Sequence, residues 1–558
     1  MKTKKLIATL LIASAGVTLI APIGTFALEN KTILSEIQSN ESDIVSIPDK
    51  NFKTLLNNAL GQPADSEIKK SDLETITILD TTRLMPQYAG DPITNIEGIE
   101  YCKNLEELGL NSNKISDLSP LSELTNLTYL SMQSNKITDL TPLANLVNLR
   151  NVDLEWNQIS DITPLTNITN LSTLRLSNNK ITDIPNLENM KSLYMLLLNK
   201  NSLNSLTPIT TAPKLEQLQL DSIGISDLTP LENMKTLTSL TYQCNEVSDL
   251  TPLSNLTNLR ILSVFGNNIN DVTPLKDLIN LESLNISRNE ISDLSPLENL
   301  NKLNYLWADY NKIENIDIIS NMPELTDIRM NFNKINNLTP LESLTKLQWV
   351  GFENNEISDI SSLSNLTNLS IVILNNNNIL NLSPLNNLTN LTTLIIENQK
   401  IENSIESTGR FATTTDIAIG VDGTPIKPKN ISENGIIKDN KLLWRNINSD
   451  TICDYSYDTT IKIGNISTRF TANATSEIKY NKGKSPVIHG ADNIEIKKGS
   501  EFNPMEGVYY TDEDEAPNSK IHVIGEVDTN IEGNYTLIYT VTDSWGNNTT
   551  FYREVFVV

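Results

Sequence analysis

The stretch that decides the fold is LEELGLNSNKISDLSPLSELTN, residues 105–126, followed without a gap by LTYLSMQSNKITDLTPLANLVN, residues 127–148. The same 22-residue frame continues to the unit that starts at Leu391. Its ninth position runs from Asn113 to Gln399 in 13 steps of 22 residues, which makes 14 units without an insertion or deletion. A fixed period of this length predicts a repeat architecture in which each unit stacks on its neighbours.

Each unit is predicted to form one coil of a solenoid. The pattern x-L-x-L-x alternates with period two, which indicates a short strand with its leucines inward and the intervening residues outward. Stacked strands form a parallel sheet along a concave face, and the asparagine that follows can satisfy buried backbone groups. Ser or Thr before Pro fits the N-cap and first residue of a 3₁₀ turn on the convex face. The fold class is therefore an α/β-type leucine-rich repeat solenoid.

The flanking segments follow different patterns. Residues 47–90 contain helical spacing of apolar side chains and are expected to cap the first coil, while the repeats themselves occupy residues 91–401. Residues 402–480 and 485–558 carry short alternating segments separated by Gly, Asn and Asp, which predicts two all-β sandwich modules of the immunoglobulin-like type. Trp444 is the expected core aromatic of the first module.

The N-terminus has the pattern of an export signal. Three lysines within the first five residues precede an apolar run, and small residues stand before a cleavage point after Ala27. We therefore expect a signal peptide over residues 1–27 and a linker over residues 28–46, with an uncleaved membrane anchor as the alternative. No later run approaches the ~18 apolar residues that a spanning helix needs, so no stable membrane span is expected after cleavage.

Composition excludes several classes of function. The chain has 558 residues, with 43 Lys and Arg against 68 Asp and Glu, and its net charge of −25 disfavours a phosphate-backbone binder. Two histidines disfavour a histidine-based zinc site, and three cysteines exclude a disulfide framework. Cys102 falls where other units carry a core leucine. No cofactor, no nucleic-acid partner and no enzymatic activity are expected.

The arrangement resembles the internalin family of Gram-positive bacteria. The resemblance rests on the export signal, a helical cap led by Ile47-Pro48-Asp49, repeats that end N-x-I-x-D-L-x-P-L, and a following immunoglobulin-like module. It implies a secreted or surface-associated protein, expected to be a monomer, that binds a host or neighbouring-cell surface protein through its concave face in adhesion, invasion or host modulation. The chain ends FYREVFVV, without the sorting motif that many relatives carry. We therefore expect release, or wall attachment through something outside this sequence.

Candidate contact residues occupy the outward third, fifth, seventh and eighth positions of the units, where the repeats stop being uniform. All three tryptophans of the repeats fall there, although the fold itself requires no indole at these positions. Exposed aromatic residues with charged neighbours are typical of binding hot spots. The main predicted patch comprises Phe265, Arg288, Tyr305, Trp307, Asp309, Tyr310, Asp327, Arg329, Phe332 and Trp349. A second predicted patch comprises Asp153, Glu155, Trp156 and Arg175.

Several alternatives remain open from the sequence. The outward side chains could pack sideways on one another for local stability, or the same aromatics could bind carbohydrate or cell wall. Because residues 22 positions apart are lateral neighbours, Gly351 is expected to leave a dip beside Trp349 that a partner side chain could enter. No catalytic residues are predicted, since an open sheet would not desolvate an acid–base pair. Asp512 and Asp514 are the metal candidates, with a solvated acidic turn as the more economical interpretation.

Overall fold

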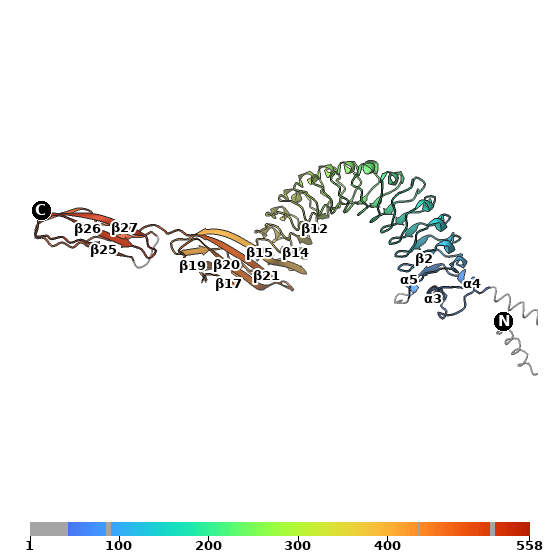
Figure 1. The fold of residues 1–558 in the computed structure, drawn as a ribbon, viewed down its shortest axis with the longest axis horizontal. Helices are drawn as coiled ribbons and strands as arrows, with labels where there is room; N and C mark the ends of the chain where they lie inside the picture. The colour runs from blue at the N-terminus through green and yellow to red at the C-terminus, as the bar shows by residue number, and fades with distance from the viewer. Residues whose placement is uncertain (1–42, 85–90, 434, 514–518) are drawn as a thin grey trace, which may run out of the picture. The chain divides into compact units, whose positions relative to one another are not determined.

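The computed structural model describes residues 43–84, 91–433, 435–513 and 519–558. The predicted signal peptide and most of the predicted linker lie outside these residues. The chain divides into two compact units, which are described separately. Figure 1 labels the helices and strands named below. Unit 1 extends through Ile225 and includes Thr229–Asn245, and unit 2 comprises Ser226–Leu228 and Glu246–Val558.

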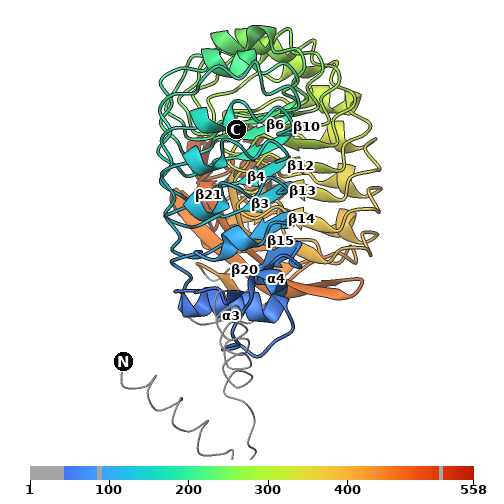
Figure 2. The ribbon, with the colours of Figure 1, turned by 90° about the vertical axis from the view of Figure 1, so that its right-hand side faces the viewer.

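Unit 1 begins with the helical cap and continues as a parallel sheet (Figure 2). Asp49 starts the first helix, because its carboxylate accepts hydrogen bonds from the backbone N–H groups of Asn51 and Phe52. Strand β1 pairs with β2 in parallel, so the sheet begins inside the segment predicted as the cap. The helices and strands are α3 (Lys50–Ala59), α4 (Lys70–Leu73), β1 (Ile78–Asp80), α5 (Thr81–Leu84), β2 (Glu107–Gly109), β3 (Tyr129–Ser131), β4 (Asn151–Asp153), β5 (Thr173–Arg175), β6 (Met195–Leu197), β7 (Gln217–Gln219) and β8 (Ser239–Thr241).

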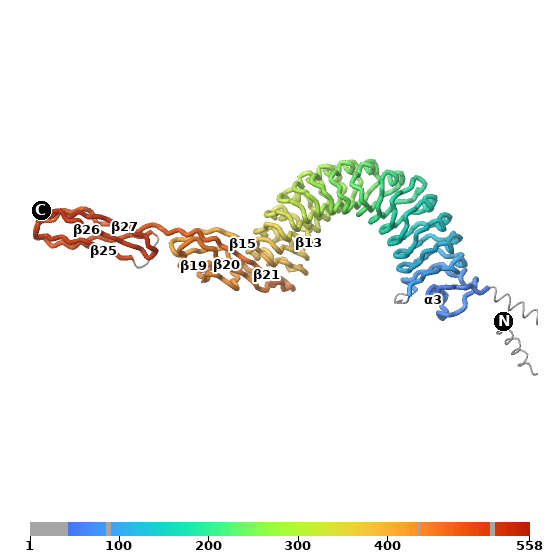
Figure 3. The backbone as a smooth tube through the Cα atoms, viewed as in Figure 1, coloured from blue at the N-terminus to red at the C-terminus, as the bar shows by residue number. Residues whose placement is uncertain are grey.

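Unit 2 continues the repeats with seven further strands, each paired in parallel with the next at a register of 22 residues. They are β9 (Ile261–Ser263), β10 (Ser283–Asn285), β11 (Tyr305–Trp307), β12 (Asp327–Arg329), β13 (Trp349–Gly351), β14 (Ile371–Ile373) and β15 (Thr393–Glu406). Each of the 14 predicted 22-residue repeats therefore contributes one strand, which begins at the third position of the repeat. Figure 3 follows the backbone through one coil per repeat, which confirms the solenoid.

The core and the asparagine ladder also match the prediction. The inward leucines, such as Leu130 and Leu306, are fully buried. At the ninth position Asn135 accepts a hydrogen bond from the backbone N–H of Ile115 at 3.0 Å and donates to the carbonyl oxygens of Leu110 and Met132 at 2.9 and 3.1 Å. One asparagine thus satisfies the turns of two adjacent coils.

The 3₁₀ turns form as expected, but their capping differs from the prediction. In the unit of Ser119 and Pro120, the residue before the turn is Leu118, and Ser119 already lies within the turn. The cap is Asp117, whose Oδ1 accepts the backbone N–H of Ser119 at 2.8 Å. A carboxylate two residues upstream reaches this N–H in an Asx turn, which explains the aspartate of the I-x-D-L-[ST]-P motif. The turns are η1 (Ile99–Tyr101), η2 (Ser119–Leu121), η3 (Thr141–Leu143), η4 (Thr163–Leu165), η5 (Thr207–Thr211), η6 (Thr229–Asn233), η7 (Thr251–Leu253), η8 (Thr273–Leu275), η9 (Ser295–Leu297), η10 (Asp317–Asn321), η11 (Thr339–Leu341), η12 (Ser361–Leu363) and η13 (Ser383–Leu385).

The last repeat strand leads directly into the next module. Strand β15 pairs with β14 through its first residues and then with β21 from Ile396 onward. Trp444 is fully buried beside Tyr455, as expected of a core aromatic. The strands of this module are β16 (Phe411–Thr414), β17 (Asn430–Ile431), β18 (Ile436–Lys438), β19 (Lys441–Arg445), β20 (Thr451–Ile463) and β21 (Ile466–Lys479).

The C-terminal module is a second all-β region. Its main sheet has the order β23-β27-β26-β25, and its core is built around Leu537, Tyr539 and Val555. The strands are β22 (Val487–His489), β23 (Ile494–Ile496), β24 (Tyr509–Thr511), β25 (Lys520–Ile524), β26 (Gly533–Thr542) and β27 (Asn548–Val557).

Candidate functional site

The backbone presents side chains in the same way in every repeat. The third and fifth positions point outward from the sheet, and the eighth position adopts the left-handed backbone conformation in all 14 units, once as Gly266 and otherwise as non-glycine residues. Asparagine and glycine tolerate this conformation best, whereas a bulky residue there is strained. Trp156, Tyr310 and Phe332 nevertheless occupy it, with φ between 54° and 57°. Because every repeat adopts this conformation, it is imposed by the fold, and the repeats carry bulky aromatic side chains there despite the strain.

The centre of the main patch is an arginine held between two tryptophans. The guanidinium of Arg329 lies 4.7 Å from the ring centroid of Trp307 and 4.2 Å from that of Trp349. Its Nε and Nη2 donate to the two carboxylate oxygens of Asp327 at 3.0 and 2.8 Å. The indole Nε1 of Trp307 donates to the same carboxylate at 3.0 Å. Asp327 is only 9% exposed, so it holds the assembly from below and offers little surface to a partner.

The dip expected at Gly351 is absent. The six-membered ring of Trp349 lies over this glycine, and a Cβ atom at position 351 would stand 2.4 Å from it. Because Gly351 has no side chain, the ring of Trp349 can pack against the sheet at this position. The register fixes which strands are neighbours, but it does not fix the direction in which a long side chain folds.

A second row of side chains runs beside the first. Arg288 lies 5.7 Å from the ring centroid of Phe265 and 4.6 Å from that of Tyr310. The rings of Tyr310 and Phe332 stack at 4.1 Å with an interplanar angle of 8°. The predicted order Arg288–Tyr310–Phe332 is therefore confirmed. We refer to Arg288, Tyr305, Trp307, Tyr310, Arg329, Phe332 and Trp349 as the arginine–aromatic cluster.

The carboxylate of Asp309 is not free to bind a partner, because it forms hydrogen bonds within the repeat structure. Its Oδ1 accepts the backbone N–H of Asn331 at 2.8 Å and the side-chain Nδ2 of the same residue at 2.7 Å. Asn331 in turn accepts the backbone N–H of Glu353, so seventh-position oxygens link successive coils. Burial raises the pKa of Asp309, while the hydrogen bonds from Asn331 oppose the increase.

The structure adds aliphatic residues that the sequence reading missed. Ile371 and Ile373 on β14 and Ile395 on β15 continue the third and fifth positions next to Trp349, and Ile395 is exposed. Aliphatic residues in such a repeat are readily assigned to the core, but the third and fifth positions of the repeat place these side chains outward. They extend the cluster with an apolar surface.

The second predicted patch lies on unit 1. Asp153 and Arg175 are cross-strand neighbours on β4 and β5. Burial raises the pKa of Asp153, while the backbone N–H of Glu155 and the charge of Arg175 oppose the increase. Trp156 is 52% exposed, and the ammonium of Lys200 lies 5.6 Å from its ring centroid. Trp156 occupies the eighth position of its repeat, whereas Asp153 and Arg175 both occupy the fifth.

The metal candidates gain no support from the geometry. No group of three or more His, Cys, Asp or Glu residues placed to hold a metal ion occurs in residues 43–84, 91–433, 435–513 and 519–558. Glu513 forms an ion pair with Lys484. Asp514 lies outside the described residues, so its predicted role is not addressed by the structure.

The comparisons identify relatives of this scaffold. An internalin (inlF) from Listeria monocytogenes is 35% identical, and the match covers 58% of this chain and 94% of the other, with a TM-score of 0.54. The chain belongs to the internalin family. The functional domain of InlJ from the same organism shares the fold at 24% identity, with coverage of 77% of this internalin and 97% of the other chain and a TM-score of 0.57.

Family models match segments of the repeats and of both all-β modules of this internalin. Residues 125–167 and 257–299 match "Leucine Rich repeats (2 copies)", residues 423–478 match "LRR adjacent", and residues 486–557 match "Bacterial surface protein, Ig-like domain". The last match indicates an extracellular or surface protein. None of the curated protein sequences shows significant similarity to this internalin. Among the described residues, every helix is too short or too polar to cross a membrane.

Proposed function

We propose that this internalin is a non-enzymatic, secreted or surface-associated protein that binds a host or neighbouring-cell surface protein through the arginine–aromatic cluster. The observation that carries the proposal is the exposure of aromatic residues beside unneutralised positive charge. Tyr305 and Tyr310 are 44% and 42% exposed. Arg288 forms no ion pair with any described residue and is held only against the rings of Phe265 and Tyr310.

The contacts favour a protein ligand over the carbohydrate alternative at this cluster. A sugar platform needs an open aromatic face and free polar groups beside it. Here Arg329 occupies a face of Trp307 and of Trp349, and the carboxylate of Asp327 is already engaged by three hydrogen bonds. A protein surface that buries the tyrosines and places a carboxylate against Arg288 fits this arrangement, because aromatic and arginine side chains dominate hot spots.

A comparative capture experiment tests the proposal. The chain and a Tyr305→Ala, Tyr310→Ala variant are used to capture host-cell surface proteins, and the proteins retained by each are identified. We expect at least one protein to bind the wild-type chain and to be lost from the variant. The matched control is Trp156→Ala, which removes an exposed aromatic from the same left-handed position in the other unit. Equal capture by wild type and the tyrosine variant would contradict the assignment.

Localisation is tested separately. The N-terminal pattern supports export, with cleavage after Ala27. The match to bacterial surface Ig-like domains supports an extracellular role in adhesion, invasion or host modulation. Retention of the whole protein in the cytoplasm of the producing cell would overturn this part of the proposal.

A further inference from the structure

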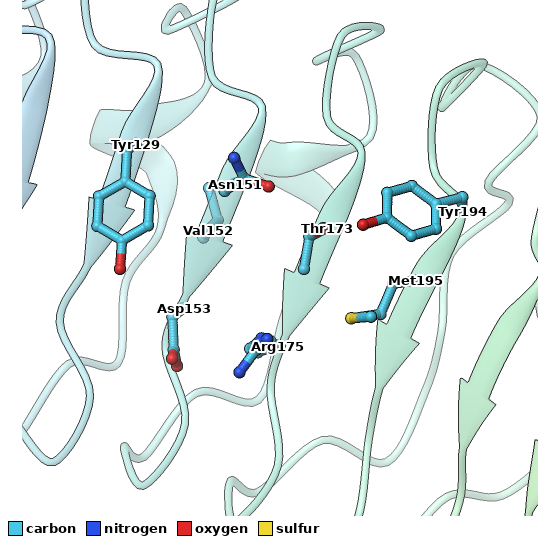
Figure 4. A pocket seen from close by; sticks show the side chains of 8 residues that line it. All are labelled: Tyr129, Asn151, Val152, Asp153, Thr173, Arg175, Tyr194 and Met195. Atoms are coloured by element: carbon cyan, nitrogen blue, oxygen red, sulfur yellow. The ribbon is translucent and has the colours of Figure 1, made fainter.

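A pocket opens on the strand face of unit 1, apart from the arginine–aromatic cluster. It has a volume of about 280 Å³, just below the ~300–1,000 Å³ typical of small-molecule sites. Figure 4 shows the side chains that line it. Its lining comes from four consecutive strands and the residue that precedes the last of them. The lining residues are Tyr129, Asn151, Val152, Asp153, Thr173, Arg175, Tyr194 and Met195.

The pocket results from a change in side-chain size along one row. Tyr129, Asn151, Thr173 and Met195 are successive cross-strand neighbours at the third position of their units. The two short side chains in the middle form a floor between larger residues at either end. Tyr194 adds a second tyrosine, whose hydroxyl points toward Thr173 in Figure 4.

The polar groups of the pocket are left open by the protein. Thr173 is only 7% exposed, yet its hydroxyl forms no hydrogen bond with another described residue, and neither does the side-chain amide of Asn151. The carboxylate of Asp153 accepts a single hydrogen bond, from the backbone N–H of Glu155 at 3.2 Å. Arg175 is exposed and forms no ion pair within the described part of the chain. Thr173 is the buried member of the set, whereas Asp153 is half-buried and Asn151 and Arg175 are exposed. All four can therefore form hydrogen bonds with a ligand that enters the pocket.

The ring faces of Tyr129 and Tyr194 are also accessible to a ligand. Tyr129 and Tyr194 are each 38% exposed, and neither ring stacks on, or holds a cation from, any residue that the structure describes. In Figure 4 the rings of Tyr129 and Tyr194 lie over the strand face at opposite ends of the pocket. The tryptophans of the arginine–aromatic cluster, by contrast, have Arg329 against their faces.

We propose that this pocket binds a neutral saccharide, with one hexose or N-acetylhexosamine ring seated over Thr173. A pyranose combines C–H groups, which pack on the negative face of an aromatic ring, with hydroxyls that both donate and accept hydrogen bonds. Tyr129 and Tyr194 supply the rings. Asp153 accepts from a sugar hydroxyl, and Arg175 donates to one. The opposite charges of these two residues balance, which favours an uncharged ligand.

The experiment uses chitotriose, lactose and maltotriose as neutral probes and heparin as a charged comparison. Each is titrated into the purified full chain by isothermal calorimetry, after a neutral-glycan array has been screened for better probes. We expect at least one neutral saccharide to bind. Its affinity should fall about tenfold or more in Tyr129→Ala combined with Tyr194→Ala, in line with the loss of two aromatic contacts and their buried area.

Two further variants separate recognition from folding. Asp153→Asn keeps the shape of the side chain but removes the charged acceptor, and it should weaken saccharide binding even if the tyrosine variant fails to fold. Tyr305→Ala combined with Tyr310→Ala removes exposed aromatics from unit 2 and should leave saccharide binding unchanged. The proposal is wrong if no neutral saccharide binds, if only heparin binds, or if the pocket variants bind as wild type does. It is also wrong if the pocket variants lose a captured protein while no glycan binds, because the pocket would then be a protein contact.

Discussion

Replacing both Trp307 and Trp349 with alanine should damage partner binding much more than it damages the fold. In the free chain the double substitution removes two cation–π contacts to Arg329 and the hydrogen bond from Trp307 to Asp327. Contacts of these kinds together contribute about 2–4 kcal/mol. The side chain of Arg329 is 34% exposed and can regain water, so the loss of stability should lie near the lower value.

Binding should respond more strongly, because hot-spot aromatics typically contribute about 2 kcal/mol or more each. Two such side chains together correspond to about 4 kcal/mol, so we expect affinity for the captured surface protein to fall roughly a thousandfold, and by at least about tenfold. Surface plasmon resonance measures the affinity. Native-state hydrogen exchange of the amides in β11–β13 measures local stability, since a repeat array need not unfold in one step.

A further variant separates the contributions of Trp307. Trp307→Phe keeps an aromatic ring over Arg329 but deletes the Nε1–H that donates to Asp327, so its effect combines the lost hydrogen bond with a weaker cation–π contact. If the double alanine variant kept full affinity, the cluster would not be the contact surface. If exchange showed β11–β13 melted in that variant, the two tryptophans would serve local packing instead.

Three further results are expected. Leu306→Ala should lower the free energy of unfolding by about 2–5 kcal/mol, because this side chain is fully buried. Asn285→Ala should lower it by about 1 kcal/mol, since only one acceptor for a backbone N–H is lost. Equal losses in the two variants would mean that the register is wrong by one residue. Burial raises the pKa of Asp49, but its hydrogen bonds from Phe52, Thr94 and Asn95 outweigh this and leave the pKa below 3.8. Asp49→Ala should therefore destabilise the cap at pH 6, and the difference from wild type should shrink as pH falls below about 4, as urea melts at several pH values would show; a constant difference would refute the linkage. N-terminal sequencing of protein from culture medium should begin at Leu28.

The repeat period made much of the site predictable. Because no unit gains or loses a residue, positions 22 apart become lateral neighbours, and the pairs Arg288–Tyr310 and Trp307–Arg329 follow by counting. The buried leucines follow from the same count. The outcome is physical, since a parallel sheet with one strand per coil leaves no freedom in register.

What the sequence could not supply is the direction and bonding of individual side chains. Trp349 lies over Gly351 instead of standing beside a dip, and no register rule chooses that rotamer. The sequence predicts that Asp309 contacts a partner, but in the structure its carboxylate accepts hydrogen bonds from Asn331 of the next coil. The sequence pattern predicts Ser or Thr as the cap of each 3₁₀ turn because those residues precede Pro, whereas in the turn at Ser119 the carboxylate of Asp117 accepts the backbone N–H from two residues earlier.

The two sites on the strand faces show how one scaffold gives two different surfaces. In unit 2 the acid and base stand two residues apart on a single strand, at positions 327 and 329, so both side chains leave the same face and the guanidinium closes on the carboxylate in two hydrogen bonds. In unit 1 Asp153 and Arg175 occupy the same position on adjacent strands and form no ion pair. Asp327 and Arg329 neutralise each other, which leaves the neighbouring aromatic surface for a protein to bury. Asp153 and Arg175 form no ion pair, so both keep their hydrogen-bonding capacity for a small polar ligand. The placement of one carboxylate, on the same strand as the arginine or on the next, therefore separates the two proposed kinds of recognition.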